Sequence, residues 1–247
     1  MMVKYDKTYV RTELKTVSAY IPDTSPYTRE SVPNNQYLSQ YLQQPIHPSV
    51  LSRTKRLIDI IGAIVGLIIT AFLAIPIAIA NFSYDRGPVF YKQTRCGLHG
   101  QTFQIWKFRS MVVNAEKLKH LVKNEAQGHI FKCANDPRIT PIGRLLRRSS
   151  LDELPQFWNV LKGEMSLVGT RPPTVDEVKN YQGHHYVRLQ VKPGMTGEWQ
   201  ANGRSSIKDF EQIVQMDIDY QQKWTAMYDL KLIIKTVWVV IKASGAY

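Results

Sequence analysis

The longest apolar stretch of the chain lies between residues 60 and 80, where the sequence reads IIGAIVGLIITAFLAIPIAIA. Thr70 is the only clearly polar residue among these 21 positions. Because a helix rises about 1.5 Å per residue, a run of this length reaches roughly 30 Å, which matches the hydrocarbon core of a bilayer. The pattern therefore predicts a membrane-inserted helix, with a buried helix of a soluble core as the alternative.

Two features of this run argue against a plain membrane span. Proline removes a helical hydrogen bond and bends or breaks a helix, and Pro76 stands late in the run. Basic residues, which are retained on the cytoplasmic side, flank both ends, namely Arg53, Lys55 and Arg56, then Arg86, Lys92 and Arg95. We therefore predict a re-entrant helix hairpin over residues 51–86, broken at Pro76 and with both ends in the cytoplasm. A helix that crosses the membrane is the alternative.

The pattern over residues 87–247 predicts a helix-rich α+β domain. Residues 85–97 and 101–111 alternate between apolar and polar positions, as two strands of a small antiparallel ribbon do. Helical composition or spacing follows at 114–126, after Pro141, at 205–224 and at 227–247. The last of these has apolar residues on one face and lysines beside it, which suits an amphipathic helix in a membrane interface and equally a helix packed on the core.

Residues 1–50 are rich in Pro, Ser, Asn, Gln and Tyr and have no sustained apolar period. This composition predicts a largely disordered polar tail. The segment also lacks the basic start, apolar centre and small-residue cleavage site of a secretory signal. We therefore expect three parts, which are this tail at 1–50, the membrane helix at 51–86 and the helix-rich domain at 87–247.

The net charge of +12 indicates an anionic partner, which by charge alone could be nucleic acid, acidic lipid or a phosphorylated small molecule. Cys96 and Cys133 are far apart and in no zinc-binding spacing, so free thiols are expected. His184 and His185 are adjacent, and neighbouring residues diverge on a helix or strand. A polar surface pair is therefore favoured over a shared metal site.

The candidate chemistry lies in residues 147–173, RRSSLDELPQFWNVLKGEMSLVGTRPP. Asp152 and Glu153 stand there between Arg147 and Arg148 upstream and Arg171 downstream. Ser150 with Glu153 also fits the capping box of a helix start. Lys107 and Arg109 are two residues apart, so on a strand they would share a face that could grip a diphosphate. Planar guanidinium forks suited to phosphate oxygens come from Arg147, Arg171 and Arg204. Together these groups suggest phosphoryl chemistry.

Seven ordered blocks within residues 52–243 carry a resemblance to a known family. They are KRLIDIIGAIVGL, GPVFYKQTRCG, FQIWKFRSM, DPRITPIGRLLRRSSLDELPQFWNVLKGEMSLVGTRP, VKPGMTGEWQANGRS, MDIDY and DLKLIIKTV. The chain resembles the bacterial sugar transferases, which are polyprenyl-phosphate hexose-1-phosphate transferases, also called monotopic phosphoglycosyltransferases.

The resemblance implies an Mg²⁺-dependent enzyme of the bacterial inner membrane whose catalytic domain faces the cytoplasm. It would transfer a hexose-1-phosphate from a nucleotide diphosphate-sugar, for which we expect a UDP-hexose, to polyprenyl phosphate such as undecaprenyl phosphate. This step would start an exopolysaccharide or another surface glycan. A non-catalytic membrane scaffold of a glycan pathway is the alternative. Membrane lipid is an expected partner, nucleic acid is not, and a homo-oligomer is left open.

The resemblance also assigns roles to individual residues. It implies that Asp152 is the nucleophile and a metal ligand, and that Glu153 is its catalytic neighbour. Phosphate binding falls to Lys107, Arg109, Arg147 and Arg171, nucleotide contacts to Arg204, and metal or hydrogen-bond support to Asp217. Pro76 matches the family's helix break.

The chain departs from the common family pattern at two places. Thr170 stands in GTRPP where many relatives have Gly-Pro-Arg-Pro, and Glu198 and Trp199 stand in TGEWQ where many have Thr-Gly-Trp-Ala-Gln. The contacts that relatives make at these positions are therefore not carried over. Neither the sugar nor the glycan pathway follows from the sequence.

Overall fold

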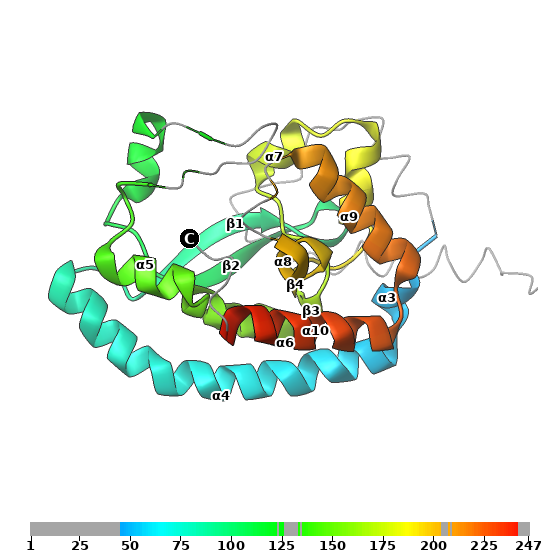
Figure 1. Ribbon diagram of the computed structural model, residues 1–247, viewed down its shortest axis with the longest axis horizontal. Coiled ribbons are helices and arrows are strands. Elements are labelled where there is room, and N and C mark those ends of the chain that lie inside the picture. Colours follow the sequence, from blue (N-terminus) through cyan, green and yellow to red (C-terminus); the bar gives the residue numbers. More distant parts are fainter. Residues whose placement is uncertain are drawn as a thin grey trace, which may run out of the picture. The chain divides into compact units, whose positions relative to one another are not determined.

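The computed structural model describes residues 45–122, 124–125, 133, 135–203, 207 and 209–241 (Figure 1). Most of the predicted tail lies outside these residues. Its last part forms the short helix α3 (Pro48–Leu51). The ring of His47, which caps α3, lies 3.0 Å through Nε2 from the carbonyl oxygen of Gln221.

The described part is helix-rich α+β, as predicted, and begins after α3 with the long helix α4 (Arg53–Tyr84). The strands are β1 (Phe90–Cys96), β2 (Thr102–Phe108), β3 (Ser166–Val168) and β4 (Gly194–Thr196). The other α-helices are α5 (Pro141–Arg148), α6 (Phe157–Lys162), α7 (Val175–Lys179), α8 (Glu198–Gly203), α9 (Phe210–Lys223) and α10 (Ala226–Ile241). The 3-10 helices are η2 (Leu98–Gly100), η3 (Ala115–Leu121), η4 (Leu151–Gln156) and η5 (Gly183–Leu189).

The described residues form two small sheets. β1 and β2 form the predicted antiparallel ribbon, in which Phe90 lies opposite Phe108 and Cys96 opposite Thr102. β3 and β4 form a parallel pair, with Ser166 opposite Gly194. Sequence reasoning missed this second pair because strands of three residues are too short to show an alternating pattern.

The predicted helices are confirmed at α5, α9 and α10, but the segment 114–126 differs. Residues 115–121 form the 3-10 helix η3 and no α-helix. Asn114, just before it, has φ 63°, a left-handed conformation that an α-helix starting at this residue would not allow. Helical composition alone therefore gave the wrong helix type here.

The predicted break at Pro76 does not occur, because α4 runs without interruption from Arg53 to Tyr84. Figure 1 shows that α4 is curved, with its concave side toward the other elements. The proline ring clashes with the carbonyl four residues earlier and opens the helix on its own side. Pro76 is exposed, on the side away from the core. The expected effect of the proline is therefore a bend toward the core and not a break.

The burial pattern of α4 is the reverse of a soluble amphipathic helix. Its buried stripe includes four polar or charged residues, Lys55, Asp59, Thr70 and Asn81. Its exposed side is apolar, and Phe72 alone has 78% of its surface exposed. The other exposed apolar residues of α4 include Leu57, Ile61, Ile64, Val65, Ile68, Ile69, Ile75, Ile79 and Phe82. A helix with its apolar side outward is stable in lipid and not in water.

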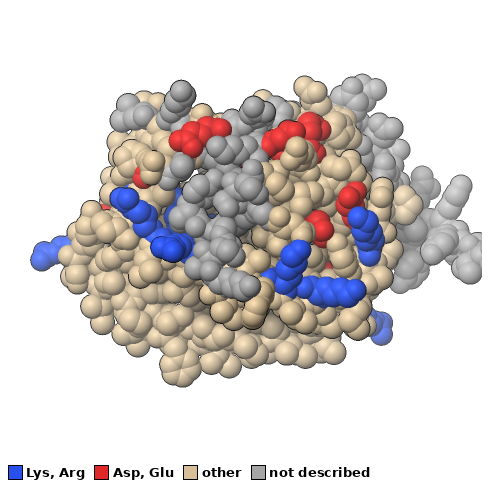
Figure 2. All heavy atoms as spheres, viewed as in Figure 1, with Lys and Arg blue, Asp and Glu red and all other residues tan. Residues whose placement is uncertain are grey.

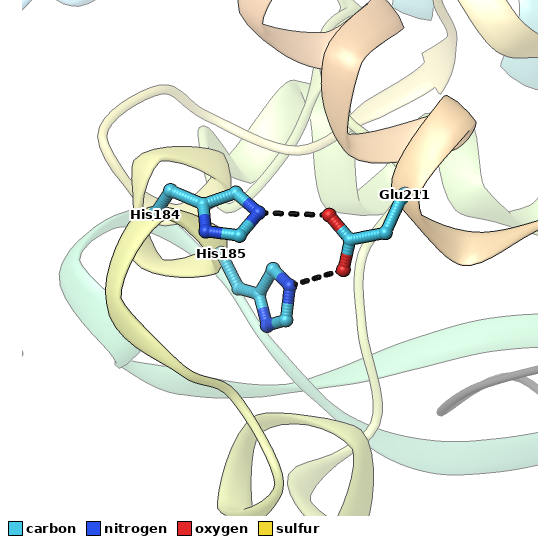
Figure 3. A group of neighbouring side chains, drawn as sticks. All are labelled: His184, His185 and Glu211. Carbon is cyan, nitrogen blue, oxygen red and sulfur yellow. Dashed lines mark hydrogen bonds and ion pairs between the residues drawn. The ribbon is translucent and has the colours of Figure 1, made fainter.

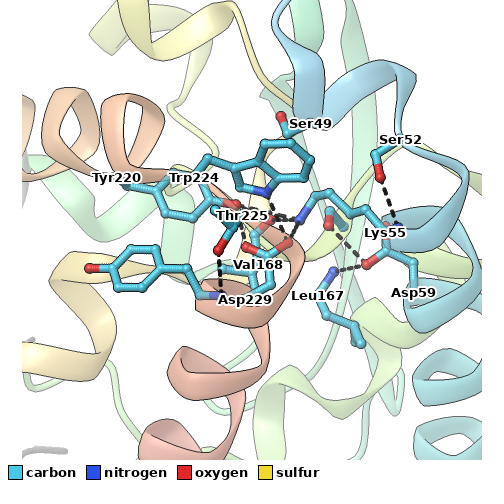
Figure 4. Close-up of polar contacts among 12 residues, drawn as sticks. Ser49, Ser52, Lys55, Asp59, Leu167, Val168, Tyr220, Trp224, Thr225 and Asp229 are labelled. Carbon is cyan, nitrogen blue, oxygen red and sulfur yellow. Dashed lines mark hydrogen bonds and ion pairs between the residues drawn. The ribbon is translucent and has the colours of Figure 1, made fainter.

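Polar contacts hold α4 to the rest of the described unit along its whole length. Near its start, Lys55 Nζ lies 2.6 Å from Asp229 Oδ2 of α10, and Asp59 accepts from the backbone N–H of Leu167 at 2.8 Å (Figure 4). Near its end, the Asn81 amide donates to the carbonyl of Arg109 at 3.0 Å. Both ends of α4 are therefore bound to the same unit.

Glycines let other elements approach the middle of α4. A Cβ on Gly66 would lie 2.3 Å from the ring of Phe157, at the start of α6, and a Cβ on Gly62 would lie 2.5 Å from Leu167 of β3. Thr70 Oγ1, one turn after Gly66, is 3.3 Å from the carbonyl oxygen of Leu154 in η4. The middle of the membrane-type helix thus contacts the segment that carries Asp152.

Figure 2 shows a surface without charged side chains on the side where α4 lies in Figure 1. Lys and Arg gather along the border of this surface, and the visible Asp and Glu lie farther away. α10 adds an exposed apolar face to the molecule through Leu230, Ile234, Val237, Trp238 and Ile241. Of the two interpretations of this helix, the exposure of its apolar face favours the interfacial one.

Candidate active site

Asp152 and Glu153 lie in the 3-10 helix η4, between α5 and α6. η4 packs on β2, and Leu151 and Leu154 from η4 cover a small cluster of Ile77, Phe108 and Leu146. Asp152 is 5% exposed. Apolar residues on both sides of the acidic pair therefore fix its backbone between the ribbon and α4.

The capping-box interpretation of this stretch is wrong. Ser150 has φ 56° and ψ 17°, a left-handed conformation, and its side chain makes no capping hydrogen bond. A capping serine has an extended backbone and accepts from the helix start. The two acids are therefore not explained by a capping box.

The two carboxylates differ in their surroundings. Glu153 is half-buried, and its Oε1 lies 2.8 Å from Nζ of Lys107, which comes from β2. The ion pair joins two residues that are far apart in the sequence and brings Lys107 into contact with the acidic pair. Because an ion pair at low exposure fixes its partners, Lys107 determines the orientation of Glu153.

Arg171 follows β3 and pairs with Glu177 of α7, whose Oε2 lies 3.0 Å from Nη1. Burial alone would raise the pKa of Glu177, but Arg171 and Arg95 outweigh it and hold that pKa below 4.5. Arg95, at the end of β1, donates through Nη1 to the carbonyl of Pro172 at 2.9 Å. Sequence reasoning noted Arg95 only as a basic residue after the membrane run, because its approach to this loop is a tertiary contact.

Arg109 has its own set of partners. Its guanidinium donates to the carboxylate of Asp85 at 2.6 Å, to the carbonyl of Asp85 at 2.5 Å and to the carbonyl of Pro88 at 2.8 Å. Asp85 caps the C-terminal end of α4. In this arrangement Arg109 anchors the end of α4 to the strand that carries Lys107.

Arg147 is in the last turn of α5, and its Nε donates to the hydroxyl of Ser110 at 3.0 Å. The approach of α5 to this strand end depends on Gly143, where a Cβ would lie 1.8 Å from the carbonyl oxygen of Ser110. Asp136 and Arg138, in the loop before α5, form a buried pair at 2.7 Å. Arg147 contributes to keeping the pKa of Asp136 below its usual value, after the larger effect of Arg138.

Asp217 lies in α9 and is 1% exposed. Its Oδ2 is 2.7 Å from Nε of Arg188, and Arg188 also donates to the hydroxyl of Tyr181 at 2.6 Å. Arg188 in turn lies 3.4 Å through Nη2 from the carbonyl of Arg171. Asp217 therefore stabilises the loop of Arg171 indirectly, through Arg188.

Arg204 lies outside the described residues. The three departures from the family pattern are described. Thr170 is buried and donates to the carbonyl of Arg188 at 2.9 Å. Glu198 accepts from the hydroxyl of Tyr228 at 2.5 Å, and Trp199 is 5% exposed. All three side chains thus make contacts inside the fold.

His184 and His185 both reach the carboxylate of Glu211, at 2.8 and 2.7 Å (Figure 3). The ligand atoms of the three residues lie within 4.8 Å of one another, which is close enough for a metal ion. However, the backbone N–H of Gln182 donates to Nδ1 of His185 at 3.0 Å. Nε2 of His185 is then the protonated nitrogen and a donor, so a polar pair is favoured over a metal site.

Comparison with known proteins gives a consistent result. The model of the bacterial sugar transferase family matches residues 50–243. The galactosyl transferase CpsE of Streptococcus agalactiae serotype III (strain NEM316) is 50% identical over 194 residues, which are 78% of this chain and 43% of that protein. The exopolysaccharide production protein ExoY of Rhizobium meliloti (strain 1021) is 38% identical over 200 residues, 78% of this chain and 88% of that protein.

A third relative is the UDP-glucose:undecaprenyl-phosphate glucose-1-phosphate transferase of Escherichia coli (strain K12). It is 37% identical over 215 residues, 82% of this chain and 44% of that protein. The chain thus spans less than half the length of some curated relatives and most of the length of ExoY. Because the family model covers the membrane-type helix, the acidic pair and the basic residues around it, the chain belongs to the bacterial sugar transferase family.

Proposed function

We propose that this protein transfers a hexose-1-phosphate from a UDP-hexose to undecaprenyl phosphate and so begins the synthesis of an exopolysaccharide or capsule. The observation that carries the proposal is a buried carboxylate, Asp152, beside the Glu153–Lys107 pair on a segment that contacts the apolar helix α4. The printed names of the relatives support it, since they include transferases for galactose and for glucose-1-phosphate.

In the proposed first step, an oxygen of the Asp152 carboxylate attacks the phosphorus that carries the sugar. The bond from this phosphorus to the oxygen of the nucleoside monophosphate breaks, and uridine monophosphate leaves. In the second step a phosphate oxygen of the lipid attacks the same phosphorus, which releases the carboxylate. Carboxylates act as covalent nucleophiles in other phosphoryl transfers. No net proton is consumed, because carboxylate and phosphate oxygens are the attacking and leaving groups throughout.

The cations of the site offset the charge of the diphosphate. Lys107 orients Glu153 next to the nucleophile, and Arg171, Arg147 and Arg204 are the proposed phosphate and nucleotide ligands. Preorganised cations stabilise charge that develops on phosphate oxygens in the transition state. Arg109 and Asp217 are proposed to act indirectly, without touching the substrate. Arg109 holds the end of α4 through Asp85, and Asp217 holds the loop of Arg171 through Arg188.

Mg²⁺ fits the oxygen donors that are present. This ion is usually bound by one or two carboxylates together with substrate phosphates, and Asp152 stands beside the cations proposed to hold those phosphates. When bound, Mg²⁺ would neutralise negative charge on the diphosphate. Asp152, to which the family resemblance assigns the metal, is the proposed protein ligand.

We further propose that the protein lies on the cytoplasmic face of the bacterial inner membrane. α4 is long and apolar enough to cross a membrane, but both of its ends contact the same unit. Its exposed apolar side and that of α10 would enter one leaflet, and the bend would make α4 a re-entrant helix with both ends on one side. The acidic pair would then lie near the headgroups, where the phosphate of the lipid acceptor is.

The substitution Asp152→Asn tests the mechanism. It keeps the shape of the side chain and removes the nucleophile, so sugar transfer and release of uridine monophosphate should fall by at least about 10³-fold. A UDP-hexose labelled in the sugar, offered without lipid, should label the unaltered protein through an acyl phosphate that hydroxylamine cleaves. Glu153→Gln should slow this labelling without abolishing it.

Several outcomes would contradict the proposal. If Asp152→Asn still became labelled, at Glu153, the nucleophile assignment would be wrong. If no adduct formed and the kinetics required both substrates at once, direct transfer would replace the two-step reaction. If the variant restored glycan synthesis in cells as well as the unaltered protein does, a scaffold role would replace catalysis.

A further inference from the structure

Arg95 differs from most of the other buried or half-buried cations described above. Most of those have a carboxylate within ion-pair distance, in the pairs Lys55–Asp229, Lys107–Glu153, Arg109–Asp85, Arg138–Asp136, Arg171–Glu177 and Arg188–Asp217. Within the described part of the chain, the hydrogen-bond partners of Arg95 are the neutral oxygens of Gln93 and Pro172. Its positive charge is therefore not neutralised by direct contact.

The guanidinium of Arg95 also has N–H donors that these hydrogen bonds do not use. Gln93 Oε1 accepts from Nε at 3.1 Å and from Nη2 at 2.7 Å, and the Pro172 carbonyl accepts from Nη1 at 2.9 Å. These contacts use three of the five N–H groups of an arginine. The two that remain, one on each terminal nitrogen, match the spacing of two phosphate oxygens.

Arg95 stands next to Arg171 because β1 is joined to the loop that follows Arg171. The backbone N–H of Cys96 donates to the carbonyl of Pro173 at 2.9 Å, and Arg95 pairs with Thr174 in an isolated bridge. Burial, and after it the charge of Arg171, lowers the pKa of Arg95 to about 10, while Glu177 and, to a smaller extent, Tyr91 and Glu153 act in the opposite direction. Arg95 is therefore still charged at neutral pH, and it lies beside a second arginine whose ion-pair partner is the carboxylate of Glu177.

We propose that Arg95, together with Arg171, binds the diphosphate of the nucleotide-sugar donor. This inference rests on the proposed function and adds a binding residue to it. Gln93 and the Pro172 carbonyl fix the plane of the guanidinium, so its remaining N–H groups are presented to phosphate with little loss of side-chain entropy. The binding of an anion would relieve the repulsion between the two arginines.

A structural role for Arg95 is the competing explanation, because the same side chain holds the loop at Pro172. The substitution Gln93→Glu separates the two. It places a carboxylate where Arg95 now meets a neutral amide oxygen, which strengthens the anchoring of the guanidinium and neutralises its charge. A structural role predicts unchanged or tighter substrate binding in this variant, and a diphosphate-binding role predicts weaker binding.

The test uses the full-length protein in detergent or nanodiscs, with inorganic pyrophosphate as the probe. Its dissociation constant would be measured by calorimetry, with and without Mg²⁺, and thermal unfolding would be followed in parallel. Arg95→Gln removes the donors, and Lys92→Gln is the matched control. Lys92 is on the same strand but exposed, with Nζ 4.0 Å from the centre of the Trp106 ring.

We expect Arg95→Gln to weaken pyrophosphate binding by about tenfold or more, Gln93→Glu by several-fold, and Lys92→Gln by less than about twofold. Unchanged binding in Arg95→Gln and Gln93→Glu would overturn the proposal. If Arg95→Gln does not fold, Gln93→Glu alone tests the proposal. Weaker pyrophosphate binding in Gln93→Glu would then support it, and unchanged binding would overturn it. Pyrophosphate binding needs no turnover, so a wild-type protein that bound it through Arg95 but transferred no sugar phosphate would refute the proposed function and leave the diphosphate site intact.

Discussion

At the scale of single residues, the two carboxylates of the acidic pair lie on one short segment but have different surroundings. Glu153 is half-buried and forms an ion pair with Lys107 at 2.8 Å, whereas Asp152, its neighbour on η4, is only 5% exposed. A carboxylate held by a lysine is a poor nucleophile, since its charge is already shared. The ion pair with Lys107 therefore suits Glu153 to an orienting role, which agrees with our proposal that Asp152 is the nucleophile.

The Lys107–Glu153 pair predicts non-additive kinetics. Lys107→Met leaves a half-buried carboxylate next to the nucleophile, so kcat/KM should fall by about 10²-fold or more. Glu153→Gln should lower kcat/KM by less. The fold-loss of kcat/KM in the double variant should be smaller than the product of the two single fold-losses, because residues in one ion pair are energetically coupled. Initial rates of uridine monophosphate release for the four proteins would show this. Strictly multiplicative effects would mean that the two residues act independently.

Glu177 predicts how stability depends on pH. The pKa of Glu177 in the folded protein is below the ordinary 4.5, because Arg171 and Arg95 outweigh burial. The unfolded chain therefore binds a proton first as the pH falls, so the stabilisation by Glu177 is complete above about pH 4.5 and is lost as the pH drops through the folded-state pKa. Thermal midpoints between pH 3 and 7 should show this fall, and Glu177→Gln should flatten it. Asp176→Asn, on the exposed side of the same helix, is the control and should leave the slope unchanged.

At the scale of elements, local pattern predicted what local forces determine. The apolar spacing at Phe210, Ile213 and Val214 predicted α9, and all three side chains are buried. The strand pair β3–β4 and the 3-10 form of η4 depend instead on tertiary contacts, such as the hydrogen bond from Gly194 N–H to the carbonyl of Thr170 at 2.8 Å. Contacts of this kind leave no periodic signal in a single sequence.

The same limit applied to the candidate site. Asp152, Glu153, Lys107 and Arg171 could be named from their motifs, and the structure brings Lys107 to Glu153. The contacts of the arginines could not be predicted from the sequence, because they form only in the folded chain. Arg109 pairs there with Asp85, Arg171 pairs with Glu177, and Arg95 donates to the neutral amide oxygen of Gln93. A sequence indicates which residue types are present, and the fold decides which charges remain available to a substrate.

The contact between α4 and α6 predicts that Gly66 is essential for the position of the acidic pair. In Gly66→Val the new side chain would overlap the ring of Phe157, which would move α6 and η4 away from α4. We expect a loss of about 1–3 kcal/mol in stability and a clear loss of transfer activity. Ala71→Val, on the exposed side of α4, is the control and should change neither. Thermal unfolding and activity in nanodiscs would measure both, and equal behaviour of the two variants would refute the packing explanation.

At the scale of the whole molecule, the apolar surface and the charged side chains lie in separate regions, as they do in a protein that binds a membrane. Figure 2 shows Lys and Arg at the edge of the uncharged surface over α4, where anionic lipid headgroups would meet them. Their attraction to headgroups adds to the burial of the exposed apolar residues of α4 and α10. Acidic residues stand farther away, so they would not be repelled by the lipid.

The bend of α4 predicts that both ends of this helix lie on the same side of the membrane. Cysteines introduced at Arg53 and Arg86, both exposed near the two ends of α4, should react with a membrane-impermeant reagent from the same face of sealed vesicles, in a protein without Cys96 and Cys133. The physical reason is that Lys55 and Asn81 tie both ends of the helix to one unit. Pro76→Leu restores the missing helical hydrogen bond and adds apolar surface, so α4 should straighten and part of the population should become a span. Position 86 should then be labelled from the opposite face in that fraction. Labelling of positions 53 and 86 from opposite faces in the unaltered protein would mean that α4 crosses the membrane and that the contacts at its two ends do not form there.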